Sequence, residues 1–91
     1  MYLLVTTSHF DRRIAKFVRA HPELRKPLAA VLRDLETGPF RPELRLHQLQ
    51  GALEGLYAVR LSYSDRITLT LELDEKEIVL LDIGSHDEVY R

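Results

Sequence analysis

The sequence predicts an α+β fold in which two N-terminal helices pack on one face of a small, mostly antiparallel four-stranded sheet. Residues 8–37 place apolar side chains at helical spacing, whereas residues 57–73 alternate apolar and polar side chains as a strand does. The expected order is one strand, two helices and three strands, and this layout covers the apolar side of both layers. A chain of 91 residues can bury one core, so we expect one domain over residues 1–91.

The first part of the chain is expected to form a strand and two helices. Residues 2–6 are rich in strand formers, and Ser8 with Asp11 has the spacing of a capping box. His21-Pro22 ends the first helix and Gly38-Pro39 ends the second. Pro27 indicates that the second helix either begins near this residue or has an irregular first turn. The apolar stripes of the two helices are Phe10, Ile14, Phe17 and Val18, then Leu24, Leu28, Val31, Leu32 and Leu35.

The second half begins with a connection and two strands. Residues 39–55 contain two prolines and two glycines, so we expect a partly extended connection docked on the core. Residues 57–63 and 67–73 both alternate apolar and polar side chains, which predicts two strands. A tight two-residue turn at positions 64–65 is expected to join them into a hairpin.

A further strand leads to the C-terminal tail. Residues 78–83 are apolar on both faces, as is typical of a strand inside a sheet. Gly84-Ser85 ends this strand and leads His86 into the tail. Functional side chains are commonly displayed at strand ends, so His86 is a candidate site residue. From the residues alone, it is more readily a surface histidine in a C-terminal loop.

Composition excludes several classes of protein. The chain has no cysteine, which excludes a disulfide framework and a cysteine-based zinc site. The longest apolar runs, at residues 2–5 and 78–81, are too short to span a membrane, and no export signal is visible. We therefore expect a cytoplasmic protein without a membrane partner.

Charge is distributed unevenly along the chain. Residues 1–45 carry nine Lys or Arg and five Asp or Glu, a net +4, and residues 46–91 carry four and nine, a net −5, which together give −1. RNA-binding surfaces are normally basic, because neutralised phosphates supply most of the affinity. Charge alone therefore favours a plain solvated surface, although a basic helical layer over an acidic sheet can still offer one face to RNA.

The second half also contains the parts of a metal-free site for phosphodiester cleavage. These parts, which one small sheet can bring together, are His47, Arg60, Asp65, Arg66 and His86. Cleavage of RNA needs a base for the ribose 2′-hydroxyl, positive charge at the phosphate and an acid for the departing 5′-oxygen. Histidine, with an ordinary pKa of about 6.5, suits the acid and the base, and the planar fork of arginine matches phosphate oxygens.

Three motifs carry a family resemblance. L-x-G-x-L-x-G-x-Y-x-x-R spans residues 49–60, D-R-I spans residues 65–67, and I-G-S-H-D-E-V-Y-R spans residues 83–91. They resemble the toxins of bacterial toxin–antitoxin pairs in the RelE/ParE superfamily, above all the YafQ-like branch, which cuts messenger RNA on the ribosome. The resemblance covers nearly the whole chain, most strongly from His47 onward. It implies the same fold, a cognate antitoxin and the ribosome with its mRNA as partners, and no metal, cofactor or small-molecule ligand.

The resemblance implies roles for single residues. Gly84-Ser85-His86 matches a G-[ST]-H motif that supplies a catalytic histidine, and His47 stands where these toxins also carry a histidine. Asp65 matches an acidic turn residue, and Tyr90 stands where the family has an aromatic residue that orients the substrate base. From the residues alone, His47 is equally a polar residue between core leucines. Asp65 is more readily a turn former, and Tyr90 also suits an anchor for the tail.

Two positions depart from the YafQ-like pattern. Arg60 stands where that pattern has a histidine and Arg66 where it has an aromatic residue, although other RelE-type toxins place arginines on these strands. Two guanidinium groups close together repel each other unless an anion such as the scissile phosphate lies between them. The alternative is that Asp65 and nearby acids form surface salt bridges with them. The departure leaves the general base unassigned.

The acids next to His86 bear on its role. Asp87 and Glu88 repel phosphate but favour a protonated imidazole, which suits a general acid. A metal site built from His47, His86 and Asp87 is conceivable, but no spaced ligand motif supports it.

The expected function is that of a toxin in a type II toxin–antitoxin system. It is a ribosome-dependent, metal-free mRNA endoribonuclease that arrests translation, with the 2′-hydroxyl attacking the adjacent phosphodiester. A ParE-type gyrase inhibitor is the first alternative, and it needs no acid–base pair such as His47 and His86. A catalytically silent member that only binds its antitoxin is the second, favoured by the acidic surface and the altered strand residues.

Overall fold

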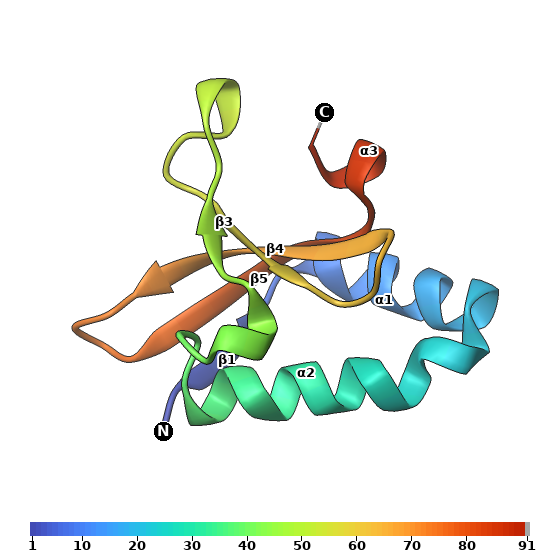
Figure 1. The fold of residues 1–91 in the computed structure, drawn as a ribbon, viewed down its shortest axis with the longest axis horizontal. Helices are drawn as coiled ribbons and strands as arrows, with labels where there is room; N and C mark the ends of the chain where they lie inside the picture. The colour runs from blue at the N-terminus through green and yellow to red at the C-terminus, as the bar shows by residue number, and fades with distance from the viewer. Residues whose placement is uncertain (91) are drawn as a thin grey trace.

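A sheet forms one layer of the molecule and two long helices form the other (Figure 1). The structure is a computed structural model that describes residues 1–90. The strands are β1 (Leu3–Thr6), β2 (His47–Gln48), β3 (Tyr57–Arg60), β4 (Asp65–Glu72) and β5 (Glu77–Ser85). The helices are α1 (Ser8–Ala20), α2 (Arg25–Thr37) and the short α3 (His86–Val89). Single 3-10 turns occupy Pro22–Leu24, Pro42–Leu44 and Gly51–Leu53.

The strand order is β1-β5-β4-β3-β2, with β1 parallel to β5 and every other pair antiparallel. The predicted α+β class and the two helices against a mostly antiparallel sheet are therefore confirmed. The sheet has five strands rather than the four expected, because β2 pairs with β3 through His47↔Ala58 and Gln48↔Tyr57. A two-residue strand shows no alternating pattern, so the sequence gives no sign of it.

The helix starts differ in detail from the prediction. Thr7, not Ser8, is the N-cap of α1, because its Oγ1 accepts the backbone N–H of Phe10 at 3.1 Å. The expected capping box of Ser8 and Asp11 is therefore wrong, because Ser8 is already the first residue of α1. The second helix begins at Arg25, after a 3-10 turn. Pro27 falls in its first turn, where the missing N–H costs no hydrogen bond.

The core lies between the sheet and the two long helices. Its buried members are Phe10, Phe17, Leu28, Leu35, Leu44, Val59, Leu61, Ile67, Leu69, Ile78, Leu80 and Ile83. The strand β5 lies between β1 and β4, which confirms the expectation of a strand inside the sheet. Both β4 and β5 are thus held on two sides, so their ends provide firm positions for side chains. None of the helices in the described part of the chain is long and apolar enough to cross a membrane.

The connection from β3 to β4 is longer than the predicted two-residue turn. Strand β3 ends at Arg60 and Asp65 already belongs to β4, so residues 61–64 form a loop. Its start is closed by the backbone N–H groups of Leu61 and Ser62, which donate to the carbonyl of Asp65 at 3.0 and 3.3 Å. Tyr63, expected on the apolar face of a strand, is instead 86% exposed at the tip of this loop.

Candidate functional site

Two arginines lie opposite each other where β3 and β4 meet the loop. Arg60 and Arg66 are direct partners in the antiparallel register, so the predicted proximity of these residues is present. Within residues 1–90 neither side chain forms an ion pair, which overturns the alternative of surface salt bridges with nearby acids. Two guanidinium groups without an acidic partner are a ready site for an anion.

Arg66 also fixes the loop. Its Nη1 donates to the backbone carbonyls of Ser62 at 2.8 Å, Tyr63 at 3.2 Å and Asp65 at 2.9 Å. Each of these hydrogen bonds has a charged donor, and such bonds are stronger than neutral ones. One side chain therefore both carries the positive charge of the site and holds the shape of the adjoining loop.

Asp65 lies behind the loop rather than on its open side. Its side chain is only 8% exposed and accepts a hydrogen bond from Ser62 Oγ at 2.8 Å, while its own backbone N–H donates to the same oxygen at 3.2 Å. The structure thus gives Asp65 the turn-forming contacts that its residue type favours.

His86 follows the end of β5 as the first residue of α3. Its backbone N–H donates to the carbonyl of Ser64 at 3.0 Å, so the tail is tied to the β3–β4 loop. The imidazole itself is 62% exposed, and its Nδ1 lies 3.7 Å from the carboxylate of Asp87. Of the two acids expected beside the imidazole, only Asp87 forms an ion pair with it.

Glu88 is used to cap α3. The hydroxyl of Ser85 accepts the backbone N–H of Glu88 at 3.2 Å, and the carboxylate of Glu88 accepts the backbone N–H of Ser85 at 2.8 Å. This reciprocal capping box explains how a four-residue helix can begin directly after a strand. It also holds His86 in the first helical position.

Arg13 of α1 anchors the same strand end, and sequence reasoning missed it. Its Nε donates to Asp82 at 2.9 Å and its Nη2 to the carbonyl of Ile83 at 3.0 Å, with Glu88 3.6 Å away. The hydrogen bond with Asp82 raises the pKa of Arg13 above its ordinary value. A Cβ on Gly84 would lie 2.6 Å from Nη2 of Arg13, so a glycine is needed for this close approach. In the sequence, Gly84 is the one sign of this close approach of Arg13 to the end of β5.

His47 reaches the site from the far edge of the sheet. Its Nδ1 lies 2.9 Å from the carbonyl of Arg45, and since a carbonyl only accepts, we assign the ring proton to Nδ1. Its Nε2, 3.2 Å from the hydroxyl of Tyr90, then accepts that hydroxyl proton. The Tyr90 ring in turn meets the ring of His86 edge to face, with centroids 4.2 Å apart.

Tyr90 therefore connects the two histidines. Burial raises the pKa of its hydroxyl, an effect that nearby Arg66 partly opposes. The hydroxyl consequently stays protonated and remains a donor to His47. The two interpretations of Tyr90, as an anchor and as a site residue, are compatible in this arrangement.

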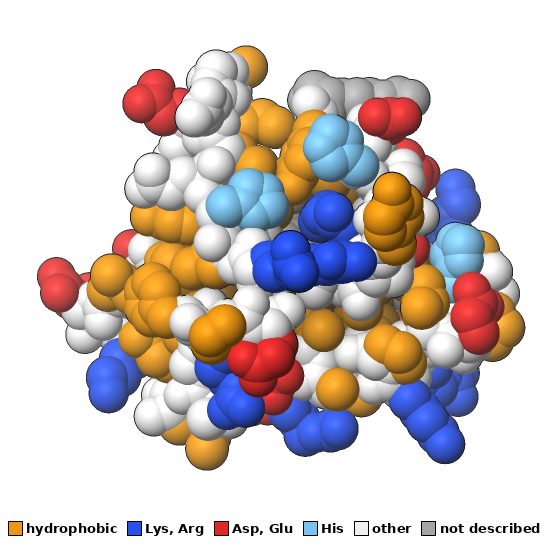
Figure 2. All heavy atoms as spheres, in the orientation of Figure 1, with side chains coloured by type: hydrophobic (Ala, Val, Ile, Leu, Met, Phe, Trp, Pro, Cys, Tyr) orange, Lys and Arg blue, Asp and Glu red, His pale blue; other side chains and the backbone are white. Residues whose placement is uncertain are grey.

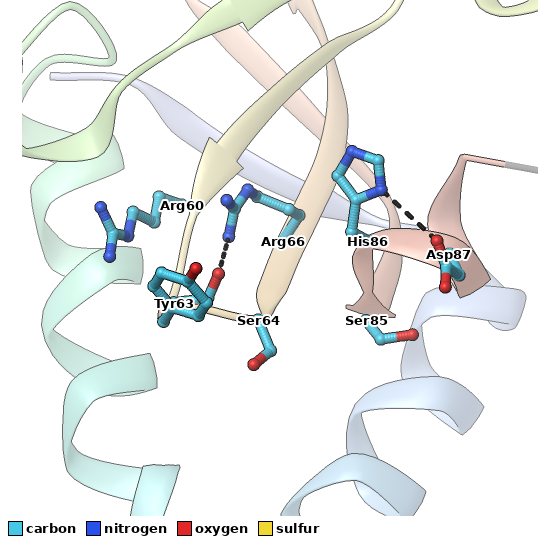
Figure 3. A pocket seen from close by; sticks show the side chains of 7 residues that line it. All are labelled: Arg60, Tyr63, Ser64, Arg66, Ser85, His86 and Asp87. Atoms are coloured by element: carbon cyan, nitrogen blue, oxygen red, sulfur yellow. Dashed lines mark hydrogen bonds and ion pairs between the residues drawn. The ribbon is translucent and has the colours of Figure 1, made fainter.

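These elements enclose an open cavity of about 470 Å³. The lining side chains are Arg60, Tyr63, Ser64, Arg66, Ser85, His86 and Asp87. Figure 3 shows Arg60, Tyr63 and Arg66 on one side of this space and His86 with Asp87 on the other. His47, Asp65 and Tyr90 are not among the lining residues.

The local charge of this face differs from the net charge of the chain. Histidines and a band of Lys or Arg side chains gather over β3, β4 and the start of α3 (Figure 2). Most acids of the second half lie elsewhere, with Asp74, Glu75 and Glu77 at the far β4–β5 turn. Asp87 is the one acid that lines the cavity, so the site is locally basic. Among residues 1–90 no three His, Asp or Glu side chains are grouped so that they can hold a metal ion.

The capping box predicts a specific pH dependence. The hydrogen bond from the backbone N–H of Ser85 holds the pKa of Glu88 below its ordinary value of 4.5. A lowered carboxyl pKa contributes stability that is fully present above the ordinary value and is lost as pH falls through the folded-state value. Glu88→Gln should therefore lose less stability than the parent protein between about pH 7 and about pH 3 in urea unfolding.

The matched control for this test is Glu75→Gln, which changes an exposed acid of the β4–β5 turn. It should keep the pH dependence of the parent protein. If the parent protein and Glu88→Gln lose the same stability as the pH falls, the role given to the Glu88 carboxylate is contradicted.

The two-layer fold, together with this cavity at the β3–β4 loop, defines a class of protein. The chain has the α+β fold of RelE/ParE-type toxins, as its likeness to solved structures shows. YafQ from E. coli superposes with a TM-score of 0.81 at 13% identity, covering 100% of both chains. A metal-bound toxin from Helicobacter pylori superposes with a TM-score of 0.80 at 27% identity, covering 98% of this chain and 99% of that one.

Two further structures belong to the same group. A YoeB/ParE toxin from Agrobacterium tumefaciens gives a TM-score of 0.77 at 15% identity, covering 92% of this chain and 98% of that one. A chain of the E. coli DinJ-YafQ toxin-antitoxin complex superposes with a TM-score of 0.71 at 16% identity, covering 99% of this chain and 98% of that one. Neither a protein-family model nor a curated protein sequence matches this chain.

Proposed function

We propose that the protein is the toxin of a type II toxin–antitoxin pair and cleaves messenger RNA on the ribosome without a metal. The observation that carries this proposal is the cavity in which Arg60, Arg66 and His86 meet with no acid paired to either arginine within residues 1–90. An anion is the natural occupant of such a site, and a histidine beside it is suited to proton transfer. The toxin fold supports the same proposal.

In the proposed reaction the 2′-oxygen of the ribose forms a bond to phosphorus and the bond from phosphorus to the 5′-oxygen breaks. His47 is the candidate base: with the ring proton on Nδ1, its Nε2 can take the proton of the 2′-hydroxyl once the hydroxyl of Tyr90 has released this nitrogen. His86 donates a proton to the departing 5′-oxygen, while Arg60 and Arg66 balance the charge that builds up on the phosphate. The products are a 2′,3′-cyclic phosphate and a free 5′-hydroxyl.

Asp65 and Tyr90 have supporting roles in this proposal. Asp65 holds the loop through Ser62, and Tyr90 holds His47 in one tautomer while packing on the ring of His86. A fixed tautomer matters because only the unprotonated ring nitrogen can act as the base.

Induction of the protein in bacteria tests the proposal. Protein synthesis should stop before DNA synthesis, and primer extension on a translated message should show discrete cuts in phase with codons. Purified naked RNA should be cut poorly, because the site is open and the ribosome must hold the message in place. Intact messages together with inhibited DNA supercoiling would support a ParE-type gyrase inhibitor instead.

The cognate antitoxin is the proposed partner. The large exposed apolar side chains of the described residues are Met1, Leu3, Phe40, Tyr63 and Leu73. Leu3 lies on the edge strand β1 opposite Glu77, and Leu73 directly follows Glu72, which is also opposite Glu77. We therefore place the antitoxin contact at this end of the sheet edge, where an extended segment can add to β1.

Co-expression with any small open reading frame found next to this gene, followed by pull-down, tests the partner. Leu3→Asp should reduce recovery of the partner at least about tenfold, since a charge would be buried in the interface. His21→Ala, on the far end of α1, should leave recovery unchanged. Full recovery with Leu3→Asp would move the contact away from β1, and the absence of any partner for the parent protein would contradict the pairing itself.

A further inference from the structure

Among residues 1–90, Tyr63 is the one tyrosine or phenylalanine that lines the cavity of the proposed ribonuclease site. It is 86% exposed, although a side chain of this size is normally at least partly covered. The guanidinium carbon of Arg60 lies 5.9 Å from the centre of the Tyr63 ring, which is the distance of a cation–π contact. One face of the ring is therefore supported by Arg60 and the ring remains open to solvent.

The loop that carries Tyr63 is held in place from several sides. Arg66 Nη1 donates to the carbonyl of Tyr63 itself and to that of Ser62. The carbonyl of Ser64, the next residue, accepts the backbone N–H of His86. An exposed tyrosine on a fixed backbone has only two side-chain torsions to order on binding, so contact with it costs little conformational entropy.

The cavity has the size and the lining for a nucleotide. Its volume of about 470 Å³ lies within the range of small-ligand sites. Figure 3 shows Tyr63 beside Arg66 and across the space from His86. A nucleoside attached to a phosphate between Arg66 and His86 can therefore reach the Tyr63 ring. Of the described residues that line the cavity, Tyr63 and His86 are the two that carry an aromatic ring.

We propose that Tyr63 is a stacking platform for the nucleobase next to the scissile phosphate, with Arg60 joining the ring to that phosphate. The proposal rests on the proposed RNA cleavage and adds a base subsite to it. Stacking accepts every base, since each has a π face, and a purine offers more ring area than a pyrimidine. The cut sites should therefore show a preference for a purine at this position rather than a strict sequence.

A fluorescent RNA tests the subsite directly. The probe is a short message that carries 2-aminopurine next to the cut position and a 2′-deoxy sugar at that position, which prevents cleavage. Bound to programmed ribosomes, it should lose fluorescence when the parent protein is added, because the analogue is quenched when its ring is stacked. Tyr63→Ala should abolish this quenching and Tyr63→Phe should keep it. Phe40→Ala removes another exposed aromatic ring, one that does not line the cavity, and should behave as the parent protein. Equal quenching by Tyr63→Ala and the parent would overturn the proposal.

Cleavage in cells separates this inference from the proposed function. Stacking on one aromatic ring contributes about 1–3 kcal/mol, so Tyr63→Ala should slow codon-phased cleavage by roughly 5- to 150-fold and weaken the purine preference, with Tyr63→Phe near the parent rate. An unchanged rate and cut pattern in Tyr63→Ala would refute the platform and leave the ribonuclease proposal standing. If the parent protein cuts no message, the ribonuclease proposal fails, and the quenching experiment still decides whether Tyr63 binds a base.

Discussion

His86→Ala should reduce cleavage of translated messages by roughly 10²–10⁴-fold, the usual contribution of a positioned proton donor. The imidazole is 62% exposed and meets the carboxylate of Asp87 and the ring of Tyr90 outside the core, so its removal leaves the core intact. The free energy of unfolding should change by no more than about 0.5 kcal/mol, as is normal for surface substitutions. Primer extension after induction measures the loss of cleavage, and urea unfolding of the purified variant measures stability.

His21→Ala serves as the matched control for this prediction. It removes another partly exposed imidazole at the end of α1, far from the cavity, and should leave cleavage unchanged. Antitoxin recovery should survive in both variants. A folded His86→Ala protein that arrests translation at full strength would remove His86 from the mechanism and favour the gyrase-inhibitor or silent-binder alternatives.

Arg66→Ala should have a comparable effect for two reasons. It removes positive charge at the phosphate, which typically costs about 10²–10³-fold in rate when one stabilising donor is lost. It also releases the carbonyls of Ser62 and Tyr63, so the loop loses the side chain that fixes it. The amides of Leu61 and Ser62, which close the loop onto Asp65, should then exchange with solvent faster.

Arg66→Lys distinguishes the two contributions. Lysine keeps the charge but has no planar fork with which to bridge several carbonyls, so it should restore part of the rate while the loop amides still exchange quickly. Arg12→Ala, an exposed arginine on α1, is the control and should change neither readout. Slow exchange in Arg66→Ala would show that the loop is held without this side chain.

The sequence allowed most of the fold to be predicted because the long elements carry strong periodic patterns. The strand β2 and the loop at residues 61–64 were missed, since short irregular segments have no periodicity. Tyr63 was placed on a strand for the same reason: an alternating pattern continued past the point at which the pairing of β3 with β4 ends at Arg60. The residue at which the pairing of two strands stops is set by tertiary hydrogen bonds rather than by local residue type.

The candidate site was predictable only in part. Arg60 and Arg66 lie on the two predicted strands on either side of a short turn, so any hairpin of these strands brings them close together. The contact between His47 and Tyr90 joins residues 43 positions apart, and the anchoring of Ile83 by Arg13 spans 70 positions. No local pattern encodes contacts of that separation, because they depend on how the edges of the sheet and the helices come together.

The parallel pairing of β1 with β5 has a consequence for how the chain folds. Leu4 pairs with Ile78, so the first strand must wait for a partner that is made more than 70 residues later. Closing a contact of such separation is slow, because the entropy of the intervening chain is lost before the pairing is gained. A growing chain that has not yet reached residue 77 lacks every partner of β1 and also Ser85, His86 and Asp87, which line the cavity. An incomplete chain therefore cannot be active during synthesis, because β5 completes both the sheet and the site.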